Sequence, residues 1–64
     1  MKITFYIYKA EPNELCLEDF ILEETQYSKI KPYIGMWRSS IPDEVINFVE
    51  SEIIAPYELD RIVG

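Results

Sequence analysis

The chain has 64 residues, of which 48% are hydrophobic, and a formal net charge of −6. A chain of this length forms one small domain and buries only about 60% of the surface that its unfolded form exposes, and it is too apolar to be disordered. Histidine is absent and Cys16 is the only cysteine, so the commonest general base, an internal disulfide and a cysteine–histidine metal site are all excluded. The unpaired cysteine and the lack of a long apolar run predict a cytoplasmic protein that does not bind membranes.

The first predicted element is a strand over residues 2–10. Ile3, Phe5 and Ile7 alternate with hydroxyl-bearing residues, and this period of two is typical of a strand with one buried face. The residue types also favour a strand. Because such a strand is not stable alone, it needs a second strand beside it.

Residues 13–24 are predicted to form a helix. Asn13 follows Pro12 as a helix cap would, and the segment is rich in helix formers. The apolar residues spread around most of a helical wheel, however, so the period is poor. A strand in which Leu15, Leu17 and Ile21 alternate remains the other interpretation.

A polar connection over residues 25–32 is expected to end at Pro32, which cannot continue a helix interior. Residues 33–38, YIGMWR, then predict a strand that pairs with the first one. Gly35 lies in the middle of this segment, where it indicates a bulge or a close approach of another backbone.

The clearest helix signal covers residues 40–53. Ser39 or Ser40 can cap the first turn, Pro42 suits that turn, and two acids follow where the helix dipole is positive. Apolar residues then recur at spacings of three and four, which predicts one buried stripe. Glu52 and Ile54 do not fit the stripe: either the helix ends near Ser51, or these two residues contact a partner.

Residues 57–63 fit either a short helix or a last strand, and their spacing slightly favours the helix. Together the segments predict a small single α+β domain over residues 1–64, with a two- to three-stranded antiparallel sheet and two helices, at 13–24 and 40–53, packed on one face. The predicted core consists of Ile3, Phe5, Ile7, Leu17, Phe20, Ile21, Ile34, Trp37, Val45, Phe48, Val49 and Ile53.

Charge is distributed in three blocks along the chain. Residues 11–24 contain six acids and no base, residues 27–38 contain three bases and no acid, and residues 43–60 contain six acids and no base. The middle block also holds Tyr27, Tyr33 and Trp37. Bases and aromatic residues together suit single-stranded nucleic acid, but the net charge of −6 opposes this partner.

Nothing in the sequence predicts an enzyme, a metal site or a cofactor. The adjacent carboxylates point in different directions on a helix, and 64 residues leave little room for a sheltered cleft. No serine, threonine or cysteine has a histidine to activate it. The two glycines, Gly35 and Gly64, cannot form a phosphate-binding loop.

We therefore expect a non-enzymatic protein-binding module, an inhibitor whose acidic, nucleic-acid-mimicking surface blocks a nucleic-acid-handling protein with a basic surface. Small acidic proteins of phages and mobile elements offer an analogy in size and charge. The residues expected to carry the binding are Glu18, Asp19, Glu23, Glu24, Asp43, Glu44 and Glu50, with Trp37 and Arg38 as interface anchors. The alternative is a structural or accessory subunit that binds through apolar surface around Tyr6, Tyr8 and Trp37, or a homodimer.

Overall fold

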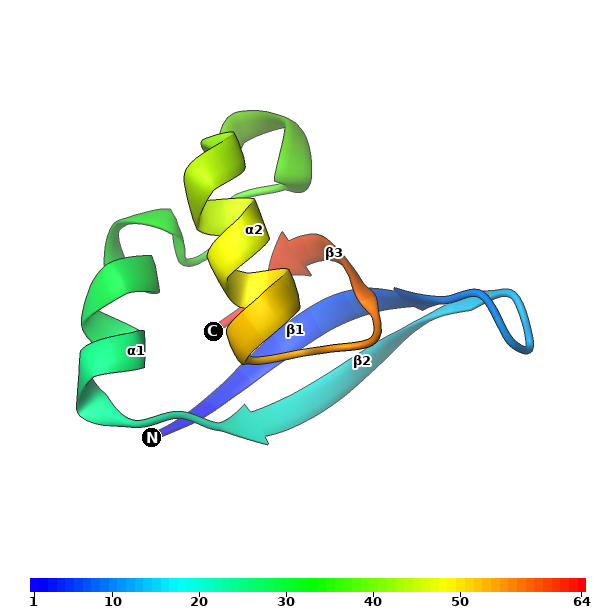
Figure 1. Ribbon diagram of the computed structural model, residues 1–64, viewed down its shortest axis with the longest axis horizontal. Coiled ribbons are helices and arrows are strands. Elements are labelled where there is room, and N and C mark those ends of the chain that lie inside the picture. Colours follow the sequence, from blue (N-terminus) through cyan, green and yellow to red (C-terminus); the bar gives the residue numbers. More distant parts are fainter.

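A computed structural model describes residues 1–64 and shows a three-stranded antiparallel sheet with two α-helices on one of its faces (Figure 1). In chain order the elements are β1 (Lys2–Lys9), β2 (Glu14–Ile21), α1 (Glu24–Ile30), the 3₁₀-turns η1 (Lys31–Tyr33) and η2 (Arg38–Ser40), α2 (Asp43–Glu52) and β3 (Glu58–Ile62). The strand order is β2-β1-β3. The predicted α+β class and the single antiparallel sheet are thus confirmed.

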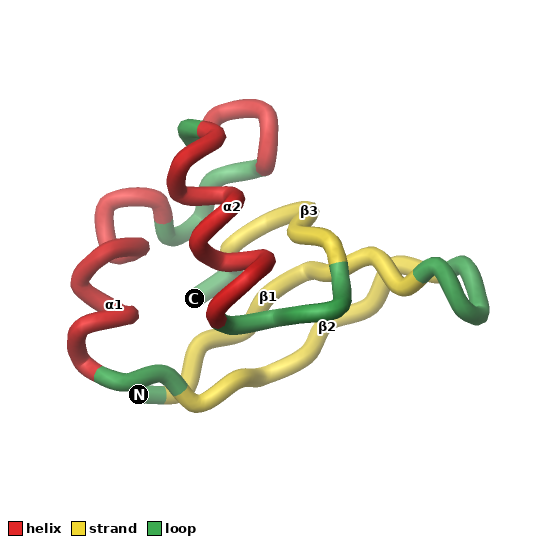
Figure 2. Tube along the Cα trace, in the orientation of Figure 1, coloured by secondary structure: helices red, strands yellow, loops and turns green.

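β1 and β2 form a regular hairpin that extends beyond the helices, as the yellow strands of Figure 2 show. The pairing runs without interruption from Lys2 opposite Ile21 to Lys9 opposite Glu14. The helix predicted for residues 13–24 is therefore wrong, and the alternating interpretation holds. Asn13 is not a helix cap: its φ of 69° is left-handed, a conformation that asparagine tolerates in turns. Pairing with β1 overrides the helix propensity of β2.

α1 lies where the sequence predicted a connection. Glu23 and Gln26 form a capping box at its start, with the Gln26 side chain accepting a hydrogen bond from the Glu23 N–H at 2.9 Å. Ile30, at the end of the helix, is fully buried. Ile30 and the half-buried Tyr27 pack against the core, and Gln26 bonds the start of α1 to the end of α2.

The strand predicted for residues 33–38 does not form. β1 is the central strand, so both of its edges are already paired with β2 and β3. The segment instead runs beside β3: Gly35 N–H donates to Ile62 O, Ile62 N–H donates to Met36 O, and Trp37 forms a bridge with Arg61. Gly35 has a left-handed φ of 89°, which explains a glycine at this turn.

α2 confirms the clearest helix prediction, with shorter bounds. Pro42 is the N-cap and no side chain caps the first turn; Ser39 and Ser40 belong to η2. The helix ends at Glu52, and Ile54, just beyond it, turns inward and is fully buried. The early end of the helix therefore resolves the misfit of Ile54, and no partner is needed to cover this side chain.

β3 explains why residues 57–63 were ambiguous. Its register against β1 shifts between Tyr6 and Ile7, which are opposite Arg61 and Leu59, so Asp60 is an extra residue. Leu59 and Ile62 consequently both face the core. This bulge gives a strand the three-residue spacing of a helix.

The core lies between the sheet and the helices. Of the predicted core, Ile3, Phe5, Ile7 and Val49 are buried, and Phe20, Ile34, Val45, Phe48 and Ile53 pack around them. The other buried residues are Leu22, Ile30, Ile41, Ile46, Ile54, Leu59 and Ile62. Leu17, Ile21 and Trp37 were wrongly placed in the core and are exposed. Neither α-helix has the length and hydropathy of a membrane-spanning segment.

Candidate functional site

The face of the sheet opposite the helices is not covered by any element of the chain. Successive side chains of a strand point to opposite faces, so the buried Ile3, Phe5 and Ile7 place their neighbours on this open face. Three aliphatic residues of β2 lie here: Leu15, Leu17 and Ile21 are 47%, 61% and 79% exposed. Aliphatic residues of this kind are usually buried. Their exposure is the most unusual feature of the surface.

An aromatic cluster continues this apolar surface toward β3. Tyr6 lies opposite Leu17 in the β1–β2 register and packs edge-on against Trp37, with ring centroids 6.4 Å apart. The Arg61 guanidinium lies over the Trp37 ring at 4.9 Å, and its Nε donates to Gly35 O at 3.3 Å. Trp37 nevertheless remains 49% exposed. We call Tyr6, Tyr8, Leu15, Leu17 and Trp37 the open-face patch.

Polar groups limit the open-face patch at both ends. Thr4 Oγ1 donates to Asp19 Oδ1 at 2.5 Å, and Lys2 Nζ lies 3.9 Å from Asp19 Oδ2, so a polar pair separates Ile21 from the patch. At the hairpin end, the Tyr8 hydroxyl donates to Asn13 Oδ1. The result is an apolar centre with a polar rim, the composition typical of protein–protein interfaces.

Glu18, a predicted partner-binding acid, projects from the other face of β2. Its Oε1 lies 3.3 Å from Lys9 Nζ, and this ammonium also lies 5.0 Å from the ring centre of Tyr57. The hydrogen bond to the Glu18 carboxylate raises the pKa of Lys9 above its usual value. Glu18 and Asp19 therefore lie on opposite faces, and each is paired with a lysine.

The predicted acids of the helices lie at two ends of the helical layer. Glu23 and Glu24 begin α1, whereas Asp43 and Glu44 begin α2. Gln26 Nε2 donates to Glu52 O at 3.4 Å, so the start of α1 lies beside the end of α2 (Figure 1). The structure does not bring these four acids together on one continuous surface.

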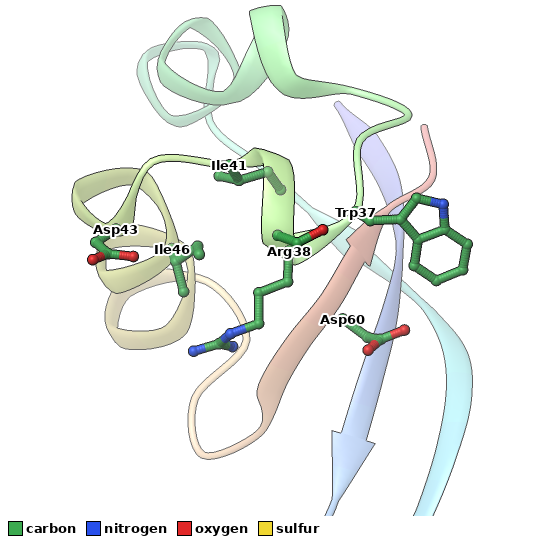
Figure 3. A pocket seen from close by; sticks show the side chains of 7 residues that line it. Trp37, Arg38, Ile41, Asp43, Ile46 and Asp60 are labelled. Carbon is green, nitrogen blue, oxygen red and sulfur yellow. The ribbon is translucent and has the colours of Figure 1, made fainter.

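Glu50 and Arg38 form an internal tie. Glu50 Oε2 accepts from Arg38 Nη1 at 2.6 Å and from the Leu59 N–H at 2.8 Å, while Arg38 Nη1 also donates to Leu59 O at 2.9 Å. Figure 3 shows the Arg38 side chain directed away from Trp37. Trp37 packs with Tyr6 and Arg61 at the open face, and Arg38 bonds at the junction of η2, α2 and β3, although both residues line the hollow between these elements.

Two hollows lie on the helical side of the molecule. One, of about 540 Å³, opens between η2, α2 and β3, and Arg38, Asp43 and Asp60 supply charged groups to it (Figure 3). The other, of about 410 Å³, lies between Lys29, Tyr33 and Phe48, where the Lys29 ammonium is 4.6 Å from the Phe48 ring centre. No three side chains of the metal-ligating types converge on either.

Sequence reasoning missed Leu15 and Leu17 as candidate surface residues, because it placed Leu17 in the core and gave Leu15 no role. The signal that could have found them was the alternation of β2. Leu15, Leu17 and Ile21 lie on one face, interrupted at Asp19, and Glu14, Cys16, Glu18 and Phe20 lie on the other. The helices cover one face of β1 and β2. The apolar side chains of β2 that point to the opposite face are therefore left uncovered.

The fold and this surface define a small α+β domain with an open-faced antiparallel sheet. No protein family, curated protein or solved structure was found to match the chain.

Proposed function

We propose that the protein is a non-enzymatic protein-binding module that docks its partner on the open-face patch. The observation that carries this proposal is the apolar surface of exposed Leu15, Leu17 and Trp37 beside half-buried Tyr6 and Tyr8, on a sheet face without a covering layer. Exposed apolar groups that touch each other and have a polar rim are a recurrent feature of docking sites.

The residue types of the patch suit an interface. Tryptophan and tyrosine dominate binding hot spots because they bury large areas at a low cost in side-chain entropy. Here the edge-on packing against Tyr6 and the stacking of Arg61 hold the Trp37 ring before any partner arrives. A patch held in one conformation loses less entropy on binding.

The overall charge of the protein bears on the chemistry of the partner. Only Glu18, Asp19 and Glu50 of the twelve acids form ion pairs, and the net charge is −6. Charge of this sign speeds encounter with basic surfaces and opposes acidic ones. The partner that fits is a protein with an apolar contact region and a basic surface.

The proposal is tested by affinity capture from host-cell lysate with three baits: the wild type, Leu15→Ser/Leu17→Ser, and Asp43→Lys/Glu44→Lys. The open-face variant should lose the captured partner, and the helix variant should keep it. Circular dichroism and thermal melting verify that both variants remain folded. A partner that both variants retain would contradict the proposal.

A second candidate is the acidic inhibitor of a nucleic-acid-handling protein, with charge rather than apolar contact as the main term. The observation that favours it is that Glu23 and Glu24 at the start of α1, and Asp43 and Glu44 at the start of α2, are exposed and form no ion pair. In this case the Asp43→Lys/Glu44→Lys bait loses the partner and the open-face bait retains it. The complex then weakens steeply with salt, whereas an apolar interface changes little.

A further inference from the structure

The outer edge of β2 presents backbone N–H and C=O groups that no other strand of this protein pairs with. Met1 and Leu22 exchange two hydrogen bonds: Met1 N donates to Leu22 O at 2.7 Å, and Leu22 N–H donates to Met1 O at 2.6 Å. Paired residues of an antiparallel ladder alternate between such bonded pairs and pairs without bonds. The bonds of β2 to β1 therefore belong to Phe20, Glu18, Cys16 and Glu14.

The backbone groups of the alternate residues consequently point away from β1. These residues are Leu15, Leu17, Asp19 and Ile21. Thr4, which is opposite Asp19, confirms the alternation, because its N–H and C=O bond to Gly64 and Val63 on the β3 side. The residues with free backbone groups are also those with side chains on the open face, so one strand presents both together.

One edge of the sheet is covered by another segment of the chain, and the other edge is not. Beside β3, the segment from Gly35 to Trp37 pairs with Ile62 and Arg61 and covers that edge. β2 has no neighbour except β1 (Figure 1). It contains no proline, no lysine and no bulge over its eight residues, although these are the devices by which sheet edges are commonly protected.

Charge decides which kind of strand can occupy this edge. β2 contains Glu14, Glu18 and Asp19 and no base; Glu14 forms no ion pair, whereas Glu18 and Asp19 pair with lysines of β1. Pairing β2 with a second copy would bring two acidic strands to a separation of about 4.8 Å. Like charges on facing strands are destabilising. A basic strand is attracted to the same edge, so the acids that oppose a second copy favour a basic partner.

We infer that β2 accepts an extended basic segment of the partner protein as a fourth, antiparallel strand; this inference rests on the proposed protein-binding function. The register of the free groups fixes the pattern of that segment. Its residues opposite Leu15, Leu17 and Ile21 are apolar and extend the open-face patch. The alternate residues are lysine or arginine and lie on the other face beside Glu14 and Glu18.

The test uses a blocked peptide of alternating valine and lysine, titrated into the full protein by calorimetry. Backbone N-methylation on the valines removes the N–H groups that point at β2 and should abolish binding, whereas N-methylation on the lysines should leave it within a few-fold. A peptide with glutamate in place of lysine has the same strand pattern and should bind at least about tenfold more weakly. Equal binding of both methylated peptides would overturn the inference, as would no binding of the parent peptide.

Amide hydrogen exchange by NMR supplies the second readout. In the free protein the amides of Leu15, Leu17, Asp19 and Ile21 should exchange fast, and those of Cys16, Glu18 and Phe20 slowly. The parent peptide should protect the first group. Protection of these amides without any peptide, with a dimer in sedimentation, would overturn the inference. A captured partner that requires Leu17 but leaves the edge amides fast would also overturn it, while the proposed function would stand.

Discussion

Replacing Glu50 with alanine should destabilise the protein, because this acid is a structural tie. Its Oε2 accepts hydrogen bonds from the Leu59 N–H and from Arg38 Nη1. The Glu50 side chain is only 23% exposed, and Leu59 is buried in the core. Its removal leaves the Leu59 N–H without a partner, and the link between α2 and β3 is lost.

The expected size follows from the two bonds. An unsatisfied buried N–H costs about 1–3 kcal/mol. The ion pair adds less than about 1 kcal/mol, because the Arg38 side chain is 44% exposed and water screens it. We expect a total loss of about 2–3 kcal/mol, which lowers the melting temperature of so small a domain by about 10–20 °C. Glu50→Gln keeps an acceptor oxygen and should lose about 1 kcal/mol or less.

Urea denaturation followed by circular dichroism measures this loss. Glu52→Ala is the matched control, since Glu52 lies on the same helix, is exposed and forms no ion pair; its stability should change by less than about 0.5 kcal/mol. If Glu50→Ala and Glu52→Ala lose the same small amount, the tie does not stabilise the fold. In that case a charge reversal of Glu50 would test binding without changing stability. The hydrogen bonds of Glu50 instead predict that such a reversal changes both.

Three further predictions concern the open face, the core and the pKa of Lys9. Leu17→Lys should change the free energy of unfolding by less than about 0.5 kcal/mol in urea denaturation, because the side chain is exposed; a loss above about 1 kcal/mol would show that Leu17 packs in the free protein. Ile54→Ala should cost about 2–5 kcal/mol in the same assay, because Ile54 is fully buried beyond the end of α2, and a near-neutral result would contradict its place in the core. The Lys9–Glu18 pair raises the pKa of Lys9 above the usual 10.5, so the stabilisation by this pair is complete below pH 10.5 and is lost as the pH rises through the raised pKa. The difference in stability between wild type and Lys9→Met should therefore shrink above pH 10.5. A difference that grows there would refute the pairing.

The sequence was informative where one pattern had one explanation. β1 alternates against a helix-covered face, and α2 has a proline, two acids and an apolar stripe in order. Both were predicted to within a few residues. The predicted α+β class holds because these two elements form, although the helix predicted at 13–24 and the strand predicted at 33–38 do not.

Prediction failed where the fold produces a pattern that imitates another. The bulge at Asp60 gives β3 a helical spacing of its buried residues. β2 has apolar residues on its open face and Phe20 and Cys16 on the other, so its hydrophobicity spreads around a helical wheel. α1 depends on the Glu23–Gln26 capping box and on Ile30, signals too local to stand out in a polar stretch.

The candidate site was only partly predictable for a related reason. Tyr6, Tyr8 and Trp37 were anticipated as anchors, but their joining to Leu15 and Leu17 depends on which strand neighbours which. The acids were anticipated from charge alone, and charge does not specify a partner: Glu50 and Glu18 lie near enough to Arg38 and Lys9 to pair. Only the distances between side chains in the fold distinguish acids that form ion pairs from acids that do not, and the sequence does not contain these distances.

The open edge and the open face of β2 have a common origin in the position of β1. Because β1 is central, its helix-facing side chains build the core, and β2 contributes only Phe20 and Cys16 to it. β2 is therefore free of the packing constraints that fix a core strand, and its apolar residues need another explanation. An edge strand with Leu15, Leu17 and Ile21 exposed is an aggregation hazard in an uncharged protein. Six acids in and around the strand reduce this hazard by repelling further copies, and they leave the edge available to a basic strand.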